Sequence, residues 1–299
     1  MDVFVTGATG LIGRSLVRAL LARGDAVTAL SRNPSARVPP GVKLLAGDPG
    51  SPGPWQDALA RADACLHLAA EPLVGRWTAD RKRRIRESRV RSTALVADVV
   101  GSAGPRVLVC ASAVGFYGDR GDEVLTEASP PGEGFLSETC RAWEEATAPA
   151  RARARVVHLR SGIVLAREGA GLSLLVLPFR LFAGGPLGSG RQWQAWIHAA
   201  DHLALALVAL DDARIVGPLN AVGPEPLTSR DMARAIGRVL HRPSLLPAPA
   251  FAIRAVLGEA AAVPLSSQRA VPAKALDLGF RFRYPTAEEA LRDLLGNAA

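Results

Sequence analysis

Three glycines, Gly7, Gly10 and Gly13, lie at intervals of three residues between a short apolar segment and a segment with apolar residues at helical spacing. Because glycine has no side chain, such a turn lets backbone N–H groups approach nucleotide phosphates at the N-terminus of the following helix. A strand before the turn and a helix after it are the context this motif requires, although the spacing is GxxGxxG and not GxGxxG. A purely structural glycine turn is the alternative. The pattern favours a dinucleotide-binding site formed by Gly7, Thr9, Gly10, Leu11, Ile12 and Gly13.

The residues after the second predicted strand, 26–30, indicate which dinucleotide fits. A carboxylate at this strand end would bind the ribose 2′-hydroxyl of NAD and repel a 2′-phosphate. The sequence has Ser31 and Arg32 instead, a hydroxyl and a guanidinium that suit the 2′-phosphate. We therefore predict NADP(H) as the cofactor, with a solvated Arg32 as the alternative.

Two hydroxyls lie at the carboxyl end of another predicted strand, 107–112. Ser112 is its last residue, and Tyr117 lies in the turn over residues 115–118. Ligands of open α/β sheets bind outside the carboxyl ends of the strands, so Ser112 and Tyr117 are the candidate catalytic residues. Lys82 and Glu71 are further titratable groups that we expect near the site.

Apolar strands alternate with helical segments over the first half of the chain. Further strands are predicted at residues 42–48, 64–70 and 156–165, and a long helix at about 78–100. The alternation indicates an α/β fold with a doubly wound parallel sheet and a smaller C-terminal substrate-binding region.

Beyond residue 165 the strict alternation ends. We predict a nucleotide-binding domain over residues 1–165, to which residues 198–222 return, and a substrate-side region over residues 166–299. Asp201 is predicted to cap a helix over 202–210, and Thr228 with Asp231 and Thr286 with Glu289 form capping-box patterns. Trp193, Trp196 and His198 are candidates for shaping a pocket, with an interdomain core as the alternative.

Composition limits the partners to be expected. The chain has 299 residues and a formal net charge of +8, and residues 76–89 are rich in arginine. Arginines nevertheless occur throughout the chain, and no aromatic interleaving accompanies the run, so we expect a small-molecule substrate and no nucleic acid. No apolar stretch reaches the roughly 18 residues of a membrane span. We expect a cytoplasmic protein with buried thiols at Cys65, Cys110 and Cys140.

The chain as a whole resembles the extended short-chain dehydrogenase/reductases. More closely it resembles an atypical, NADP-binding, epimerase-like family with a C-terminal extension. The matching segments are residues 6–13, 68–72, 76–78, 82, 88–90, 112, 115–118, 140–144, 160–165, 268–269, 272, 278–282, 284–285 and 289–292. The resemblance implies a Rossmann fold, NADP(H) and cofactor contacts from Leu68, Ala69, Ala70, Arg89, Ser112 and Arg160.

The sequence departs from the superfamily where hydride transfer needs its acid. Ordinary members use a Tyr whose phenol pKa is lowered by a Lys four residues later. Here these positions hold Phe135 and Thr139, and the usual carbonyl-binding hydroxyl falls on Ala113. Arg89 replaces an Asn that contacts the cofactor in ordinary members, and its guanidinium suits a phosphate or carboxylate.

Two hypotheses follow. The first is an NADP(H)-dependent oxidoreductase or epimerase-like enzyme acting on an unidentified small molecule, either a nucleotide sugar or a carbonyl compound. The second is a catalytically silent NADP(H)-binding sensor, which the missing Tyr and Lys would explain.

Overall fold

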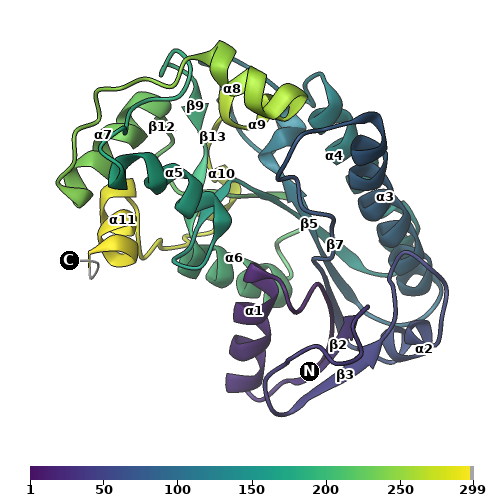
Figure 1. Cartoon of the computed structure of the whole chain (residues 1–299). Helices are drawn as coiled ribbons and strands as arrows, with labels where there is room; N and C mark the ends of the chain where they lie inside the picture. Colours follow the sequence, from purple (N-terminus) through teal and green to yellow (C-terminus); the bar gives the residue numbers. More distant parts are fainter. Residues whose placement is uncertain (297–299) are drawn as a thin grey trace.

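The structure is a computed structural model that describes residues 1–296, and its centre is a seven-stranded parallel sheet (Figure 1). The strand order is β11-β7-β5-β4-β1-β2-β3, so the direction of strand addition reverses between β1 and β4. Such a reversal creates the crevice in which open α/β sheets bind ligands. The strands are β1 (Asp2–Thr6), β2 (Ala26–Ser31), β3 (Val42–Ala46), β4 (Ala64–His67), β5 (Val107–Ala113), β7 (Arg155–Ser161) and β11 (Gly217–Ala221).

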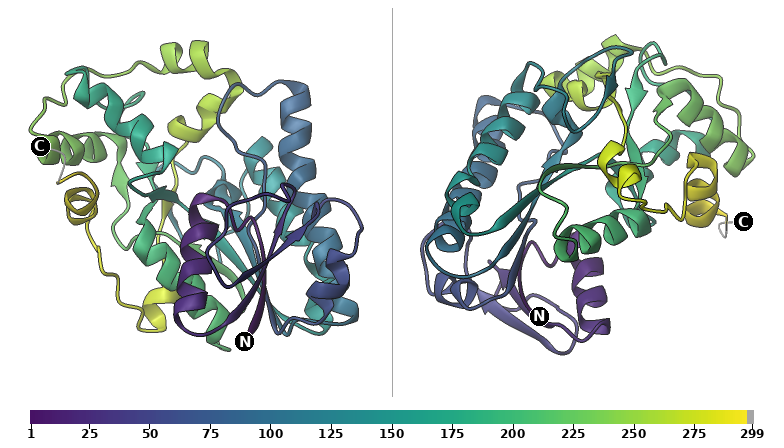
Figure 2. Two further views of the ribbon diagram at one scale, coloured as in Figure 1. Left: turned by 60° about the horizontal axis from the view of Figure 1, so that its bottom comes forward. Right: turned by 180° about the vertical axis from the view of Figure 1, so that it is seen from behind.

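Helices cover both faces of this sheet, as the two views of Figure 2 show. Alternate strand side chains point to opposite faces, so each face has its own apolar core. Val3 and Val5 pack against α1 (Leu11–Ala22) and α6 (Ala199–Asp211). Phe4 faces the other way, towards α2 (Trp55–Ala60) and α3 (Ala79–Ser102). The predicted α/β fold is thereby confirmed.

Shorter elements follow the fifth strand of the chain. A 3-10 turn, η1 (Val114–Tyr117), leads to β6 (Val124–Leu125) and α4 (Phe135–Glu145), and η2 (Ala148–Ala152) precedes β7. Helix α4 packs against α3, η1 and β5. The helix therefore stands beside the carboxyl end of β5.

The C-terminal region packs beyond the carboxyl ends of the strands (Figure 1). Its own core includes Trp196, Met232 and Leu291. Its elements are β8 (Ile163–Leu165), α5 (Ala170–Arg180), β9 (Trp193–Gln194), β10 (Trp196–His198), β12 (Leu227–Thr228), α7 (Ser229–Leu240), α8 (Ala250–Leu257), η3 (Gly258–Ala261), α9 (Ala262–Leu265), β13 (Arg269–Ala270), α10 (Ala273–Asp277) and α11 (Ala287–Leu295). Two of these contact earlier parts of the chain, since β13 pairs with β6 and α10 packs on β11 of the large sheet.

Two local predictions are wrong for identifiable reasons. Asp201 does not cap α6: the Nδ1 atom of His198 accepts the hydrogen bond from Ala200 N at 3.0 Å. The buried carboxylate of Asp201 instead accepts the backbone N–H groups of Arg283 and Tyr284, at 2.8 and 3.0 Å. The single strand predicted over 156–165 is broken at Gly162, where a Cβ atom would lie 2.6 Å from the carbonyl oxygen of Ala195.

Other local predictions are confirmed. The three cysteines are free and buried. Thr286 and Glu289 form the capping box of α11. Within residues 1–296, no helix is long and apolar enough to cross a bilayer.

Candidate functional site

The glycine turn at the end of β1 is held tightly on one side and open on the other. Gly7 has a φ of +73°, and a Cβ atom there would lie 2.8 Å from the backbone of Leu68 and Ala69. A Cβ on Gly13 would lie 2.8 Å from Ala8 Cα, so both glycines are needed for packing. A Cβ on Gly10 would meet only the carbonyl oxygen of Gly7, at 3.3 Å. Gly10 therefore leaves free space on the exposed side of the turn.

Helix α1 begins at this turn without a side-chain cap. Gly10 is its N-cap residue, no side chain hydrogen-bonds the first turn, and the first turn holds no acidic residue. The first N–H groups of a helix lack intrahelical acceptors and carry a partial positive charge. Thr9 is exposed, and Leu11 and Ile12 are half-buried at the same end of α1. The turn and helix start thus fit the phosphates of a nucleotide.

The neighbouring strand ends extend this surface in both directions. On one side, Arg32 follows β2, is exposed and has no ion pair within residues 1–296, while the Ser31 hydroxyl accepts the N–H of Asn33 at 3.1 Å. On the other side, Leu68 and Ala69 follow β4, and both backbone N–H groups donate to the Thr6 hydroxyl at 3.2 Å. The Thr6 contact holds the β4 loop, which continues to Ala70, against the turn.

A cavity of about 250 Å³ lies at the carboxyl ends of β5 and β7. Its lining comes from α3, α4, the strand ends and two C-terminal segments. The lining residues are Leu73, Ile85, Arg89, Ala113, Val114, Gly115, Leu136, Thr139, Cys140, Trp143, Ser161, Gly162, Ile163, Trp193, Gln194, Ala195, Val263, Ser266 and Gln268. In the sheet, β5 is separated from β1 only by β4, so the cavity continues the row of strand ends that begins at the glycine turn.

Arg89 brings a buried positive charge to the cavity wall. Its guanidinium donates from Nη1 to the carbonyl oxygens of Ile85 and Glu71, at 2.9 and 3.0 Å. The group lies 5.0 Å from the Trp143 ring. Burial lowers the pKa of Arg89, against weaker opposing effects of Cys140 and Glu71. The arginine is therefore fixed in position without a carboxylate partner within the described residues.

Thr139 lies in the same wall and carries a polar atom without a partner. Its side chain is 1% exposed, and its hydroxyl has no hydrogen bond among the described residues. The sequence places Thr139 at the usual lysine position, so the four-residue spacing from Phe135 was a usable indication of its location. Phe135 itself packs edge-on against Trp77, with ring centroids 5.3 Å apart.

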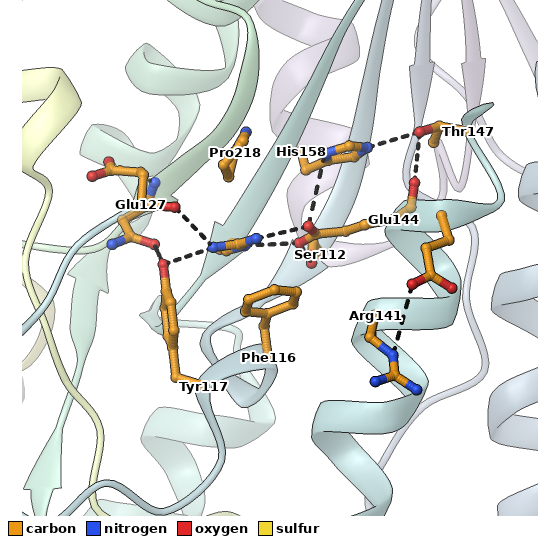
Figure 3. A network of polar contacts seen from close by, with 12 residues as sticks. Ser112, Phe116, Tyr117, Glu127, Arg141, Glu144, Thr147, His158 and Pro218 are labelled. Atoms are coloured by element: carbon orange, nitrogen blue, oxygen red, sulfur yellow. Dashed lines mark hydrogen bonds and ion pairs between the residues drawn. The ribbon is translucent and has the colours of Figure 1, made fainter. Parts of the chain in front are cut away.

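The two candidate catalytic hydroxyls lie outside the cavity lining, in a buried polar network (Figure 3). Ser112 donates to Glu144 Oε1 at 2.7 Å. Tyr117 is fully buried, and its hydroxyl donates to Asn220 at 2.6 Å. Burial raises the pKa of Tyr117, although Arg160 opposes the shift. Direct proton donation from either hydroxyl is therefore not supported by this geometry, because the strand end turns Ala113 and not Ser112 towards the cavity.

Arg160 is the centre of that network rather than a contact in the nucleotide turn. Its Nε and Nη2 atoms donate to the two carboxylate oxygens of Glu144, both at 2.8 Å. Its Nη1 atom donates to the Tyr117 hydroxyl at 3.0 Å, and the guanidinium lies 3.5 Å from the Phe116 ring centroid. These internal bonds occupy the guanidinium of Arg160, and its expected cofactor contact stays a prediction.

The two further titratable groups expected near the site, Lys82 and Glu71, form ion pairs with other residues. Lys82 forms an ion pair with Glu259 at 2.6 Å, and Glu71 pairs with Arg81 at 2.5 Å. Of the three residues expected to shape a pocket, Trp193 lines the cavity, whereas His198 caps α6 and the buried Trp196 donates to the carbonyl oxygen of Glu225. The sequence alone does not identify Glu144, Asn220 or Thr139 as site residues.

Comparisons with known proteins agree with this architecture. The model of the NAD dependent epimerase/dehydratase family matches residues 3–223, and a domain of unknown function (DUF1731) matches residues 248–294. "Epimerase family protein SDR39U1 homolog, chloroplastic" of Arabidopsis thaliana is 40% identical over 306 residues, covering 99% of this chain and 87% of the relative. Epimerase family protein YfhF of Bacillus subtilis is 36% identical over 301 residues, 99% of each chain.

Solved structures give the same result. The crystal structure of human epimerase family protein SDR39U1 with NADPH has a TM-score of 0.88 and 33% identity, covering 99% of this chain and 100% of the human chain. A nucleoside-diphosphate sugar epimerase from Corynebacterium glutamicum has a TM-score of 0.80 and 38% identity, covering 99% of this chain and 58% of that one.

Proposed function

The chain belongs to the NAD dependent epimerase/dehydratase family, and on that premise we propose that it is an NADP(H)-dependent oxidoreductase acting on a small molecule. One observation carries the proposal: the uncapped start of α1 and the cavity lie along one row of strand ends. The human relative crystallised with NADPH supports the choice of cofactor. Bound in this row, the cofactor would supply hydride chemistry.

The chain's own residues divide this task. Leu11 and Ile12 present backbone N–H groups to the pyrophosphate, whereas the Gly10 N–H already donates to the carbonyl oxygen of Gly7 at 3.0 Å. Arg32 with Ser31 receives the 2′-phosphate. Strands lie about 4.8 Å apart, so the row from β2 to β5 spans about 14 Å. A dinucleotide extended along it brings its nicotinamide end to the edge of the cavity at β5, and the cavity itself is left for the substrate.

The cavity favours a small carbonyl compound over a nucleotide sugar. Its volume of about 250 Å³ is below the range of about 300–1,000 Å³ that holds drug-sized ligands. Most of its wall is apolar, which excludes water from a reacting carbonyl. Ser112 and Tyr117 then act indirectly, because their bonds to Glu144 and Asn220 hold the end of β5 and the η1 turn.

A sensor without turnover is the second candidate, and the composition of the cavity wall favours it. The wall includes no Asp, Glu, Lys, His or Tyr among the described residues. Its one thiol, Cys140, has its pKa raised to about 12 by burial and so stays protonated. No group of the wall has the pKa near neutrality that suits a general acid.

Three measurements separate the candidates: NADPH binding, NADPH oxidation and protease sensitivity. Calorimetric titration with NADPH tests binding, and loss of reduced-nicotinamide absorbance with a panel of small aldehydes and ketones tests turnover. NADPH binding with oxidation by a panel member supports the oxidoreductase. Binding without oxidation, together with altered protease sensitivity of the C-terminal region, supports the sensor. Absence of NADPH binding rejects both.

If turnover is found, variants at the network test the indirect role. Ser112→Ala and Tyr117→Phe then reduce turnover through altered positioning, and the acidic and basic limbs of the pH profile stay where they are. A shifted limb would instead restore a direct proton-transfer role for that hydroxyl, for which a loss of roughly two to four powers of ten in turnover is expected.

A further inference from the structure

One buried cation in the cavity wall has no counter-ion within residues 1–296. Arg89 is 7% exposed, and the two carboxylates of the adjoining elements are already paired. Glu71 binds Arg81 at 2.5 Å, and Glu144 binds Arg160 at 2.8 Å. Buried charges in proteins are as a rule paired or bound to a ligand, because desolvation of an isolated ion is costly.

The guanidinium of Arg89 is held in a fixed position by its neighbours. The Nη1 bonds to two carbonyl oxygens and the Trp143 ring, whose centroid lies 5.0 Å from the guanidinium carbon, hold it in position. Trp143 is itself anchored, since its indole N–H donates to the Thr93 hydroxyl at 2.9 Å. The Nε and Nη2 groups of Arg89 have no acceptor among the described residues and remain available for a planar, two-oxygen partner.

A second polar group in the same wall has no hydrogen-bond partner among the described residues. The Thr139 hydroxyl is buried and makes no hydrogen bond in the described chain. Unsatisfied buried hydroxyls are uncommon, and a ligand is one way to satisfy them. The rest of the nearby wall, including Ile85 and Leu136, is apolar, which strengthens an interaction between a cation and an anion.

We propose that the cavity binds the oxyanion of a small acid, with Arg89 as its ion-pair partner and Thr139 as a hydrogen-bond donor. That this acid is the substrate rests on the proposed function, whereas the anion site itself does not depend on it. We place the cofactor phosphates at the glycine turn after β1, and the nicotinamide end that lies towards β5 carries no phosphate. Arg89 also contacts the loop after β4, through the carbonyl oxygen of Glu71, so the NADPH titration of the Arg89 variant below tests this placement.

The test compares benzoate with benzamide, its uncharged analogue of the same shape, by calorimetry on the full chain with and without saturating NADPH. We expect benzoate to bind at least tenfold more tightly than benzamide. Arg89→Met removes that preference, and Thr139→Val weakens benzoate a few fold. Arg86→Met serves as the matched control, because Arg86 is an exposed arginine of the same helix. Melting curves of each variant verify folding.

Each result has a defined meaning. Tighter binding of methyl phosphate than of benzoate, with the same loss in Arg89→Met, supports the oxyanion site and makes a phosphate its ligand. Equal binding of benzoate and benzamide, or no binding of any anion, overturns the inference. So does a loss of NADPH affinity in Arg89→Met as large as in Arg32→Ala, which would assign Arg89 to the cofactor. Anion binding by a chain that binds no NADPH would reject the proposed function while leaving the anion site intact.

Discussion

Two arginines are buried on the same side of the sheet, Arg160 and Arg89. They differ in their hydrogen-bond and ion-pair partners. Arg160, on β7, meets both oxygens of Glu144 at 2.8 Å and is stacked on Phe116. Arg89, on α3, lies 5.0 Å from the Trp143 ring centroid and, within residues 1–296, donates only to backbone carbonyl oxygens. Their pKa values move in opposite directions: the bonds to Glu144 raise that of Arg160 despite its desolvation, whereas desolvation lowers that of Arg89.

The difference separates a structural charge from a charge available to a ligand. Arg160 has its counter-ion inside the protein, and the surrounding bonds link β5, β7, β11 and α4 (Figure 3). Removing one partner there leaves the other as an uncompensated buried charge. Arg89 has no carboxylate partner within the described residues that its removal would leave unpaired. We therefore expect removal of Arg89 to relieve a desolvation cost and to leave folding intact.

Substitution of the counter-ion is expected to have the largest effect. Glu144→Gln keeps the shape but leaves Arg160 uncompensated, so unfolding free energy should fall by about 3–5 kcal/mol. Arg89→Met should change it by less than about 1 kcal/mol. Urea denaturation of both variants measures the contrast. Equal losses in the two variants would mean that Arg89 is as structural as Arg160.

Acid should destabilise the Arg160 network but not the cavity wall. The network includes a titratable histidine ring, and the cavity wall has none among its described residues. His158 lies 3.9 Å from Glu144, and burial lowers its pKa to about 4; burial has the same effect on His67 and His202. The unfolded chain takes up these protons near pH 6.5, before the folded chain does. Stability is therefore full above pH 6.5 and falls between pH 6.5 and 4, by up to about 3 kcal/mol per histidine.

The histidine contribution is isolated by comparing two variants over this pH range. His158→Gln should flatten the loss of stability by the share of one histidine, whereas Arg89→Met should keep the wild-type slope. Denaturation midpoints at several pH values provide the measurement. An unchanged slope in His158→Gln would place the acid sensitivity in the other groups.

The same contrast between satisfied and available groups applies to the backbone at Gly10. Valine adopts the extended conformation of Gly10, with φ −73° and ψ 173°, so Gly10→Val should fold. Its side chain would occupy the space in front of the first helical N–H groups and weaken NADPH at least hundredfold, about 2.7 kcal/mol. Gly171→Ala is the control, since a Cβ there meets no atom closer than 3.8 Å. Wild-type circular dichroism with undiminished NADPH affinity in Gly10→Val would remove the turn from the binding site.

The sequence predicted the elements well because their patterns are local. Apolar runs identified the buried strands, and Gly7 and Gly13 are required by contacts within the turn or with the adjacent β4 loop. Asp201 shows the limit of this reasoning: it has the side chain of a helix cap, but contacts with residues 283 and 284 claim it. No local pattern contains a partner that is more than 80 residues away.

The side-chain directions at the candidate site depend on the fold in the same way. Ser112 and Ala113 are adjacent at a strand end, and the direction of each side chain depends on the register of β5, which a sequence leaves undetermined by one residue. Arg160 and Arg89 are indistinguishable as sequence letters, because their roles depend on whether Glu144 reaches them in the fold. The missing lysine was visible in the sequence, but the unsatisfied hydroxyl of Thr139 was not.

Arg32 is the exposed counterpart of the buried arginines Arg89 and Arg160. Because its guanidinium has no ion pair within residues 1–296, its charge is free for the 2′-phosphate, and solvent screening limits its strength. Arg32→Ala should weaken NADPH by about 1–3 kcal/mol and leave NADH unchanged. Arg37→Ala, which removes another exposed arginine of the same loop, controls for net charge. Titration of both cofactors decides the matter: equal NADH and NADPH affinities in the wild type, or equal losses for both in Arg32→Ala, would end the assignment of this loop and leave Arg89 as the arginine to test for phosphate binding.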